Sequence, residues 1–523
     1  MRRAMILAPI AALMVSGCAD DGSDGADGAD GVDGLSSLLA VEIVPRGDST
    51  CAGGGRIAAS GLDSNRNGVL DANEVSEREY LECLTAPRLR ALHASPDAPP
   101  VNIIINGNAA LTNVDYREGS GFLDANEQTR VEVAAIVPGG DVVVIDETLQ
   151  LEFSTEYTLI AAGNVAAPVA ALLIENPADE PIVAGSVRAQ VVHAAPSAPA
   201  VDVYVTAPDA DLAASSPVNE VPLAFQNATE RVTVPAGEYR IRVTAAGDAR
   251  TVVFDSGTVA LPADADLMLV AVENVGPGAS AIQLVTLDDT AATPLLDVNT
   301  PASVLAVHAS SDAPAVDVLA NITNTAENEA VPLARGVMFP AACSISSVPA
   351  GEYELSITAA GDPSTVALQF DLAAEGGDEI AAIVSGYLGS TPPLQAIALA
   401  SDTRPVATEA KVRITHASPG TGAVDIYLLA DGVDLNAGTT TPSFAAVPFG
   451  SDTGVLSIAP GTYDVYVTPS GNRNVIAIEV ADLALAGGQV LDVLARDPAT
   501  DGSEGTLPQL LVIDYENVSE CPT

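Results

Sequence analysis

The sequence predicts an all-β fold, and two observations support that prediction. From about residue 88 onward, short apolar runs alternate with turn residues roughly every ten positions, and none of the runs has a helical period. A stretch that joins two such runs through a small-residue turn also recurs four times, at intervals of roughly 100 to 115 residues. Because repeats of that length can close their own cores, the pattern indicates four tandem immunoglobulin-like antiparallel β-sandwich domains behind a small N-terminal module.

The start of the chain is typical of an exported lipoprotein. Met5 to Val15 is an apolar run that suits a signal peptide and is too short to cross a bilayer of about 30 Å as a helix. The tetrapeptide V-S-G-C that ends at Cys18 resembles a bacterial lipobox. We therefore expect a signal peptide over 1–17, lipidation of Cys18 and anchoring in a membrane at the cell surface; Ala19 favours the outer membrane under the sorting rule of enteric bacteria. The alternative is ordinary signal cleavage beside a chance cysteine.

Residues 18–36 form a tether between this anchor and the folded part of the chain. From Gly22 to Gly34 a glycine stands at every third position, a period that is typical of collagen-like triple helices. The run contains few triplets and no proline, so we interpret it as a flexible acidic spacer.

Residues 37–87 are predicted to be a small module built around a calcium loop. Ser36 to Val44 is typical of a strand, and the run from position 63 matches D-x-N-x-N-G-x5-E at every specified position. Calcium would be a structural ion, bound by Asp63, Asn65, Asn67, the backbone carbonyl of Val69, Asp71 and Glu74. A helix is expected to leave the loop through Val75 to Leu81, and glycines leave no room for an entering helix, so the loop is similar to those of dockerin-like modules. The alternative is a polar turn that binds nothing.

Four cysteines besides the lipidation site allow three disulfide pairings. We favour Cys51–Cys83 because both lie in one small segment, and closing that loop contributes roughly 3–4 kcal/mol in the chain-entropy model. Cys343 and Cys521 then remain, and their bond would link the third repeat to the end of the chain; whether they pair stays open.

The four repeats are predicted to occupy 88–186, 187–302, 303–410 and 411–523. The second copy is the clearest, because Tyr239 to Ala245 alternates strictly after a Pro-Ala-Gly turn. That hairpin phrase recurs in the third and fourth copies, whereas Val142 stands in the first copy where the others have Tyr239, Tyr353 and Tyr463.

The start HASPDAPxVDVY, followed about 40 residues later by VPAGxYxhxVTxAG, resembles the domain-of-unknown-function family DUF4397, which is common in exported and cell-wall proteins. The tether, cysteine, calcium loop and second cysteine similarly resemble a small module of bacterial surface lipoproteins, DUF7151. The fourth copy departs from the pattern at Gly420 to Gly422, and the third has Ser311 in place of proline. These resemblances imply β-sandwich repeats at a cell surface and no activity.

The chain has only four histidines, and each stands at the same place in one repeat: His93, His193, His308 and His416. Each could ligate a metal, with Asp202, Asp317 or Asp425 nearby in three copies. Zinc usually takes three or four protein ligands, and no second histidine or local cysteine is present. We therefore interpret the histidines as structural residues that bond across the turn.

The amino-acid composition argues against several classes of function. A net charge of −48 with one lysine disfavours nucleic-acid binding, and the absence of tryptophan disfavours carbohydrate stacking. No nucleophile elbow, zinc-protease helix or phosphate loop is present in the sequence. We expect a protein that is not an enzyme, with an adhesive or envelope-structural role and an envelope protein or polysaccharide as partner. The alternatives are a carbohydrate- or protein-binding receptor of a polymer-degrading system and an extracellular hydrolase with an unrecognised site.

Overall fold

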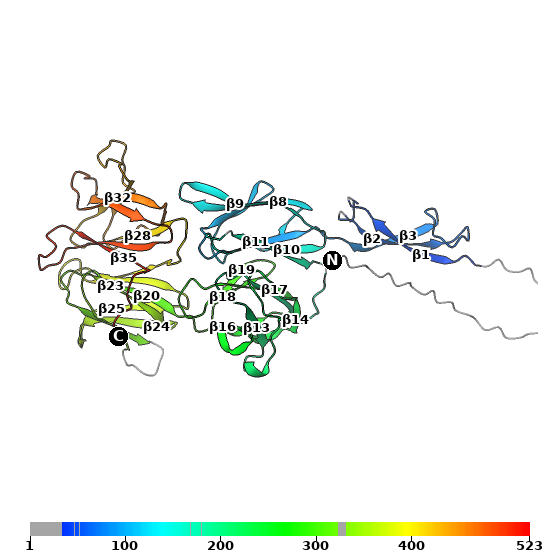
Figure 1. Cartoon of the computed structure of the whole chain (residues 1–523), viewed down its shortest axis with the longest axis horizontal. Coiled ribbons are helices and arrows are strands. Elements are labelled where there is room, and N and C mark those ends of the chain that lie inside the picture. The colour runs from blue at the N-terminus through cyan, green and yellow to red at the C-terminus, as the bar shows by residue number, and fades with distance from the viewer. Residues whose placement is uncertain (1–33, 47, 52, 168, 179, 323–330) are drawn as a thin grey trace, which may run out of the picture. The chain divides into compact units, whose positions relative to one another are not determined.

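The computed structural model describes residues 34–523 except positions 47, 52, 168, 179 and 323–330, and it separates into two compact units, Met1–Leu84 and Thr85–Thr523 (Figure 1). The predicted signal peptide, the lipidation site Cys18 and nearly all of the tether lie outside the described residues. Strands dominate the described part, which agrees with the predicted all-β class, and its one helix is the 3-10 turn η1 (Leu212–Ala214). In that part, no helix has the length and apolarity needed to span a membrane.

The first unit is a three-stranded antiparallel sheet of β1 (Ser37–Val44), β2 (Gly55–Leu62) and β3 (Val75–Cys83), with β2 in the middle. β1 is the strand predicted there. The helix expected over Val75 to Leu81 is wrong, because that segment is β3. A helix of so few residues would be marginal on its own, whereas pairing with β2 satisfies the backbone along the segment.

The second unit contains four pairs of sheets, one pair in each predicted repeat. The strands of the first repeat are β4 (Arg88–Ala94), β5 (Val101–Ile105), β6 (Asn108–Val114), β7 (Leu123–Asp124), β8 (Gln128–Val137), β9 (Gly140–Gln150), β10 (Thr155–Ala162) and β11 (Ala170–Pro177). Those of the second are β12 (Ser186–His193), β13 (Val201–Thr206), β14 (Val232–Pro235), β15 (Gly237–Ala245), β16 (Asp248–Leu261), β17 (Ala265–Glu273), β18 (Ile282–Leu287) and β19 (Ala292–Leu295). Their sheets have the orders β11-β10-β4-β7 with β6-β5-β8-β9, and β14-β12-β17-β18-β19 with β13-β15-β16.

The third and fourth repeats follow the same plan. The third comprises β20 (Ala302–His308), β21 (Val316–Ile322), β22 (Val331–Val337), β23 (Ala341–Val348), β24 (Gly351–Ala359), β25 (Asp362–Ala374), β26 (Glu379–Ser385) and β27 (Gln395–Ala400). The fourth comprises β28 (Ala410–Ala417), β29 (Val424–Ala430), β30 (Phe444–Val447), β31 (Leu456–Ile458), β32 (Gly461–Pro469), β33 (Ile478–Leu485), β34 (Val490–Arg496) and β35 (Gln509–Asp514). Their sheet orders are β23-β20-β26-β27 with β22-β21-β24-β25, and β31-β28-β34-β35 with β30-β29-β32-β33.

Most strand pairs are antiparallel, as predicted, but each repeat adds one parallel pair. In every case the pair joins the histidine-bearing strand to a later strand of the same repeat: β4 with β10, β12 with β17, β20 with β26, and β28 with β34. Parallel strands are usually buried on both faces, so this pairing explains why even charged side chains of these strands, such as Arg90, Arg188 and Arg413, are buried. In β28, for example, all eight residues are buried.

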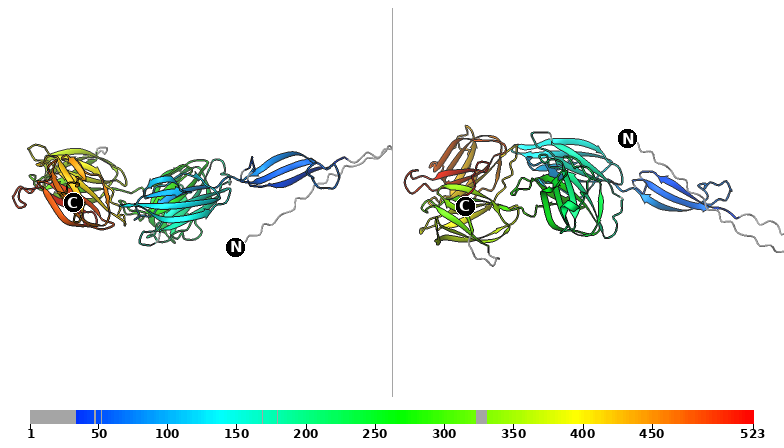
Figure 2. Two further views of the ribbon diagram at one scale, coloured as in Figure 1. Left: turned by 90° about the horizontal axis from the view of Figure 1, so that it is seen from above. Right: turned by 60° about the horizontal axis from the view of Figure 1, so that its bottom comes forward.

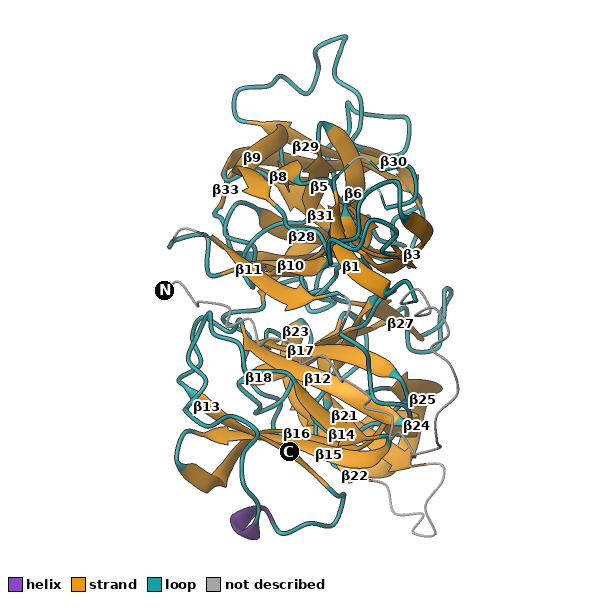
Figure 3. Cartoon of the chain, turned by 90° about the vertical axis from the view of Figure 1, so that its right-hand side faces the viewer, coloured by secondary structure: helices purple, strands orange, loops and turns teal. Residues whose placement is uncertain are grey.

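These doubly buried sheets pack in pairs. One continuous core joins Leu92 and Ile160 of the first repeat to Val192 and Val270 of the second. A second core does the same for the third and fourth repeats, from Leu305 to Leu494 among others. Two sandwiches therefore share each interface: side chains of β10 and β18 belong to one core, and side chains of β20 and β35 belong to the other (strands labelled in Figure 1; two further views in Figure 2). Strands make up the body of each sandwich, and loops lie at the ends of the sandwiches (Figure 3).

Candidate functional site

The predicted calcium loop connects β2 to β3 and is drawn together by Asp63. One carboxylate oxygen of Asp63 accepts a hydrogen bond from the amide of Asn67 at 3.0 Å, and the other accepts from the amide of Gly68 at 2.8 Å. Gly68 has a φ of 77°, a left-handed conformation that favours glycine, so the turn requires it at this position. Asp63 is buried, and its negative charge is thereby held at the centre of the loop.

Three more of the predicted ligands gather around the same centre. The Oδ2 atom of Asp71 accepts from the side-chain amides of Asn65 at 2.7 Å and Asn67 at 2.9 Å. Val69 lies on the outside of the turn, where its amide donates to Asn67 at 2.7 Å. The loop thus brings Asp63, Asn65, Asn67 and Asp71 together, which are the oxygen-bearing side chains that calcium prefers.

Glu74 is placed differently from the bidentate ligand that the motif predicts. Its Oε1 atom accepts from the Ser64 hydroxyl at 2.7 Å and from the amides of Ser64 and Asn65, while Oε2 accepts from the amide of Asp71. The hydroxyl of Ser64 and these amides lower the pKa of Glu74, so the group is a carboxylate that ties the two ends of the loop together. Across the described residues, His, Cys, Asp and Glu side chains do not gather in threes in a way that could hold a metal by themselves.

Both disulfides considered in the sequence are present. Cys51–Cys83 closes the small module, and Cys343–Cys521 joins β23 to the segment that follows β35. The amide of Cys521 also donates to the carbonyl of Ser344 at 2.8 Å, and the amide of Arg335 donates to the carbonyl of Pro522 at 2.7 Å. The end of the described chain is therefore fastened across the edge strands of both sheets of the third repeat.

The four histidines occupy one geometry. Each is buried, and its Nε2 atom lies 2.9–3.0 Å from the carbonyl oxygen six residues later, which belongs to Pro99, Pro199, Pro314 or Gly422. An aromatic ring stands edge-on to each imidazole, and the four rings are Tyr116, Phe225, Phe339 and Phe449. Burial lowers the pKa of every one of these histidines, so they are held neutral in the folded chain.

The aspartate that follows the histidine turn in three repeats forms hydrogen bonds to other turns. Asp317 accepts from the amides of Gly336 at 2.7 Å and Gly361 at 2.9 Å, and Asp202 and Asp425 make equivalent contacts to backbone amides. These carboxylates bond to turn amides, so the structure does not assemble the alternative His–Asp metal site. The hydroxyls of Tyr239, Tyr353 and Tyr463 likewise donate to the carbonyl four residues earlier.

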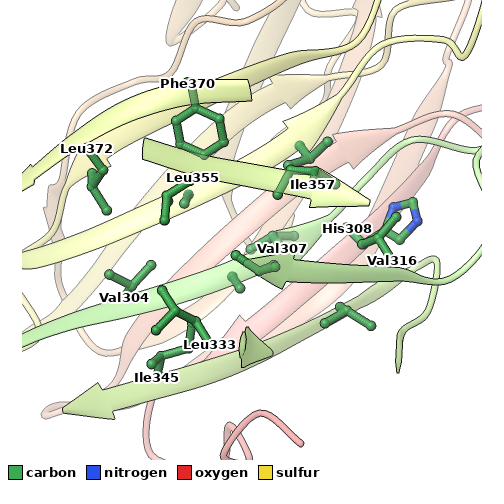
Figure 4. Close-up of a pocket in the computed structure, with 15 residues that line it drawn as sticks. Val304, Val307, His308, Val316, Leu333, Ile345, Leu355, Ile357, Phe370 and Leu372 are labelled. Atoms are coloured by element: carbon green, nitrogen blue, oxygen red, sulfur yellow. The ribbon is translucent and has the colours of Figure 1, made fainter. Parts of the chain in front are cut away.

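A small cavity lies between the two sheets of the third repeat. Figure 4 shows aliphatic side chains such as Leu355 and Ile357 around it, with His308 at one end. Its volume of about 30 Å³ is far below the roughly 300–1,000 Å³ of ordinary small-molecule sites. We interpret the cavity as imperfect packing of an Ala- and Val-rich core.

Sequence reasoning missed the buried ion pairs. Arg413 and Asp492 lie 2.6 Å apart with both side chains nearly inaccessible, and Tyr515 donates to the same carboxylate. Arg404 is also buried, and it donates to the carbonyl of Ala98 and to Asp115 in the first repeat. The available signal was composition: in a chain with only 21 lysines and arginines, an arginine between the apolar residues of a strand needs a partner if it is buried.

Three stretches of the chain match models of known protein families. Residues 87–204 and 302–427 match the family model "Domain of unknown function (DUF4397)". Together these two stretches cover just under half of the chain, and each is similar to DUF4397. Residues 36–83 match a second family, "Domain of unknown function (DUF7151)", over the small module. Both predicted resemblances are thereby confirmed. Each matched stretch begins at the first strand of one repeat and ends within the second strand of the next repeat, so it includes two of the four histidines.

Comparisons with individual proteins add little to the DUF4397 assignment. No curated protein matches the chain significantly. Among solved structures, one titled "Product complex of a multi-modular glycogen-degrading pneumococcal virulence factor SpuA" is similar over 53% of this chain and 37% of its own, at 10% identity and a TM-score of 0.14.

Proposed function

We propose that this chain is a non-catalytic, surface-anchored lipoprotein with an adhesive or envelope-structural role. The observation that carries the proposal is the use made of the repeat motif. In all four copies the histidine binds a turn carbonyl, and in three copies the motif aspartate binds turn amides. The recurring polar residues are thus occupied in holding strands and turns in place.

Attachment through Cys18 would place the repeats outside the cell. Two disulfides favour an oxidising compartment of that kind. The distribution of charge supports exposure to solvent as well, because several of the few cations, including Arg188, Arg404 and Arg413, are buried against acidic partners. An outer surface of strongly negative charge keeps such a protein soluble, and it favours an envelope protein or a polysaccharide over nucleic acid as partner.

We also propose that the Asp63–Glu74 loop binds one structural calcium ion. Asp63, Asn65, Asn67 and Asp71 already lie close together, and the carbonyl of Val69 would supply a further oxygen. Glu74 would have to exchange its bonds to Ser64, Asn65 and Asp71 for the ion, which weakens binding. We therefore expect a dissociation constant on the order of 10⁻⁴ M, as in extracellular calcium modules.

Metabolic labelling with a clickable fatty acid tests the anchored part of the proposal. The wild-type chain should take up the label and fractionate with membranes, and Cys18→Ser should do neither. Chemical crosslinking on intact cells should then capture an envelope component. The purified chain should not degrade an envelope polymer. Degradation that is lost in a His193→Ala variant which still folds would contradict the non-catalytic role.

A further inference from the structure

The small module has one sheet face that its own loops do not cover. Residues 37, 39, 41 and 43 of β1 point to this face, and the strand register places residues 62, 60, 58 and 56 of β2 on the same side. Leu39 is 72% exposed and Ile43 is 87% exposed, with Val41 and Leu62 also about half exposed. We call this surface the open face. The opposite face contains the buried residues Ile57 and Ala59.

The open face is divided lengthwise by charge. Opposite the aliphatic stripe of β1, the register of β3 brings Glu77, Glu79 and Glu82 to the same side, all of them exposed. Between these two borders runs β2, whose open-face residues at its middle are the small Ala58 and Ser60. The result is a face with aliphatic side chains along β1 and carboxylates along β3, and one of these carboxylates, Glu82, lies 4.0 Å from Arg56 at the end of β2.

The spacing of the two outer strands fits one α-helix. Neighbouring strands are spaced about 4.8 Å apart, so β1 and β3 lie about 10 Å from each other, which is close to the diameter of a helix with its side chains. Alternate residues of a strand are about 6.8 Å apart, and residues four apart in a helix rise about 6 Å, so two or three contacts can be made along the stripe.

We propose that the open face of β1–β3 docks a cationic amphipathic helix of a partner protein. The aliphatic side of that helix would pack on Leu39, Val41 and Ile43, and a flanking row of lysine or arginine would face Glu77 and Glu79. The charge pattern argues for this occupant over two others. A second copy of this chain would bring the same glutamates and a strongly negative net charge, and an anionic lipid surface would be repelled by them. The inference does not depend on calcium binding or lipidation.

A designed helical peptide of about 18 residues tests the proposal on the full chain. It carries leucines at every fourth position along one stripe and lysines along the adjacent stripe, and a scrambled peptide of identical composition serves as its control. Fluorescence anisotropy should show binding of the designed peptide that weakens as salt is raised, because surface charge attraction is screened. The scrambled peptide should bind at least tenfold more weakly.

Three variants locate the contact. Leu39→Ser with Ile43→Ser should weaken binding at least tenfold, and Glu77→Gln with Glu79→Gln should weaken it several-fold and flatten its salt dependence without threatening the fold. Val142→Ser with Val144→Ser, which removes exposed aliphatic residues from β9, should leave binding unchanged. Equal binding of both peptides, or no effect of the glutamate changes, overturns the proposal. It is also overturned if sedimentation shows a dimer that Leu39→Ser with Ile43→Ser dissociates, or if vesicles of anionic lipid bind at this face.

Discussion

The strands of the small module and the histidine-bearing strands of the repeats contrast in how they use apolar residues. β1 is apolar along nearly its whole length, yet the side with Leu39, Val41 and Ile43 is open. β28 alternates apolar residues with polar ones such as Lys411 and Arg413, yet both of its sides are buried, one in its own sandwich and one against the third repeat. The difference teaches that alternation does not mark an exposed side in this chain, because contacts between sandwiches also bury charged side chains.

A matched pair of substitutions should show the largest contrast. Val270→Asp puts a charge into the core shared by the first two repeats, where no partner exists for it, and should lower the free energy of unfolding by more than about 4 kcal/mol. Leu39→Asp places the same group on the open face and should change it by less than about 0.5 kcal/mol. Chemical denaturation of the full chain compares the two. Equal losses would mean that the open face is covered.

The same contrast can be sharpened with fragments. Residues 187–302 alone would expose the side of β17 that contains Val270, whereas residues 85–302 retain its cover. The shorter fragment should melt at a lower temperature and bind a hydrophobic dye. Identical melting of the two would show that each sandwich is stable without its neighbour.

The next effect concerns the buried ion pair between Arg413 of β28 and Asp492 of β34. Asp492→Asn leaves the guanidinium of Arg413 buried without its counter-charge, which should cost about 3 kcal/mol. The control is Asp146→Asn, which removes the partner of the exposed Arg130 and should have no measurable effect on thermal unfolding. A comparable loss in both variants would contradict the structural difference between the two pairs.

A smaller effect is expected at the repeated turn. His193→Ala removes the bond to the carbonyl of Pro199 and should cost about 1–2 kcal/mol, with metal content unchanged. Because burial lowers the pKa of His193, the unfolded chain takes up the proton first as pH falls. Stability should therefore be constant above about pH 7.5 and decline below the unfolded value of about 6.5, and the decline should be shallower in His193→Ala. A stoichiometric transition metal lost in the variant would contradict the structural role.

The smallest effect is expected in the module itself. At about ten times its dissociation constant, calcium should stabilise the wild-type module by roughly 1.4 kcal/mol, and Glu74→Gln should remove most of that gain. Glu77→Gln, which alters β3 outside the loop, is the control. Isothermal titration at millimolar calcium measures both variants, and an absence of heat from the wild type would leave the loop as a polar turn.

Several features of the fold could be predicted because they are local. The alternation from Tyr239, the turn phrase before it and the spacing of the histidines all depend on neighbouring residues, and they locate strands and repeats well. The pairing of sandwiches could not be predicted. β12 is buried on both faces, and its sequence does not show which face packs inside its own sandwich and which packs against the neighbouring one. The segment after Glu74 was taken for a helix because the calcium motif usually ends in one, and pairing with β2 overrode that local preference. The hydrogen bonds of Glu74 to the amides of Ser64 and Asp71 could not be predicted, because these amides become close to it only in the folded loop.

The Cys343–Cys521 bond also sets the route that a mechanical pull would take. The two cysteines are 178 positions apart, and the fourth sandwich lies entirely between them. Tension applied beyond Cys521 would pass through the two sulfur atoms directly into β23, so the fourth sandwich would carry none of the load. The fourth sandwich would stay folded while the segments before Cys343 carry the force. Its surface would therefore remain intact at any tension that does not break the disulfide.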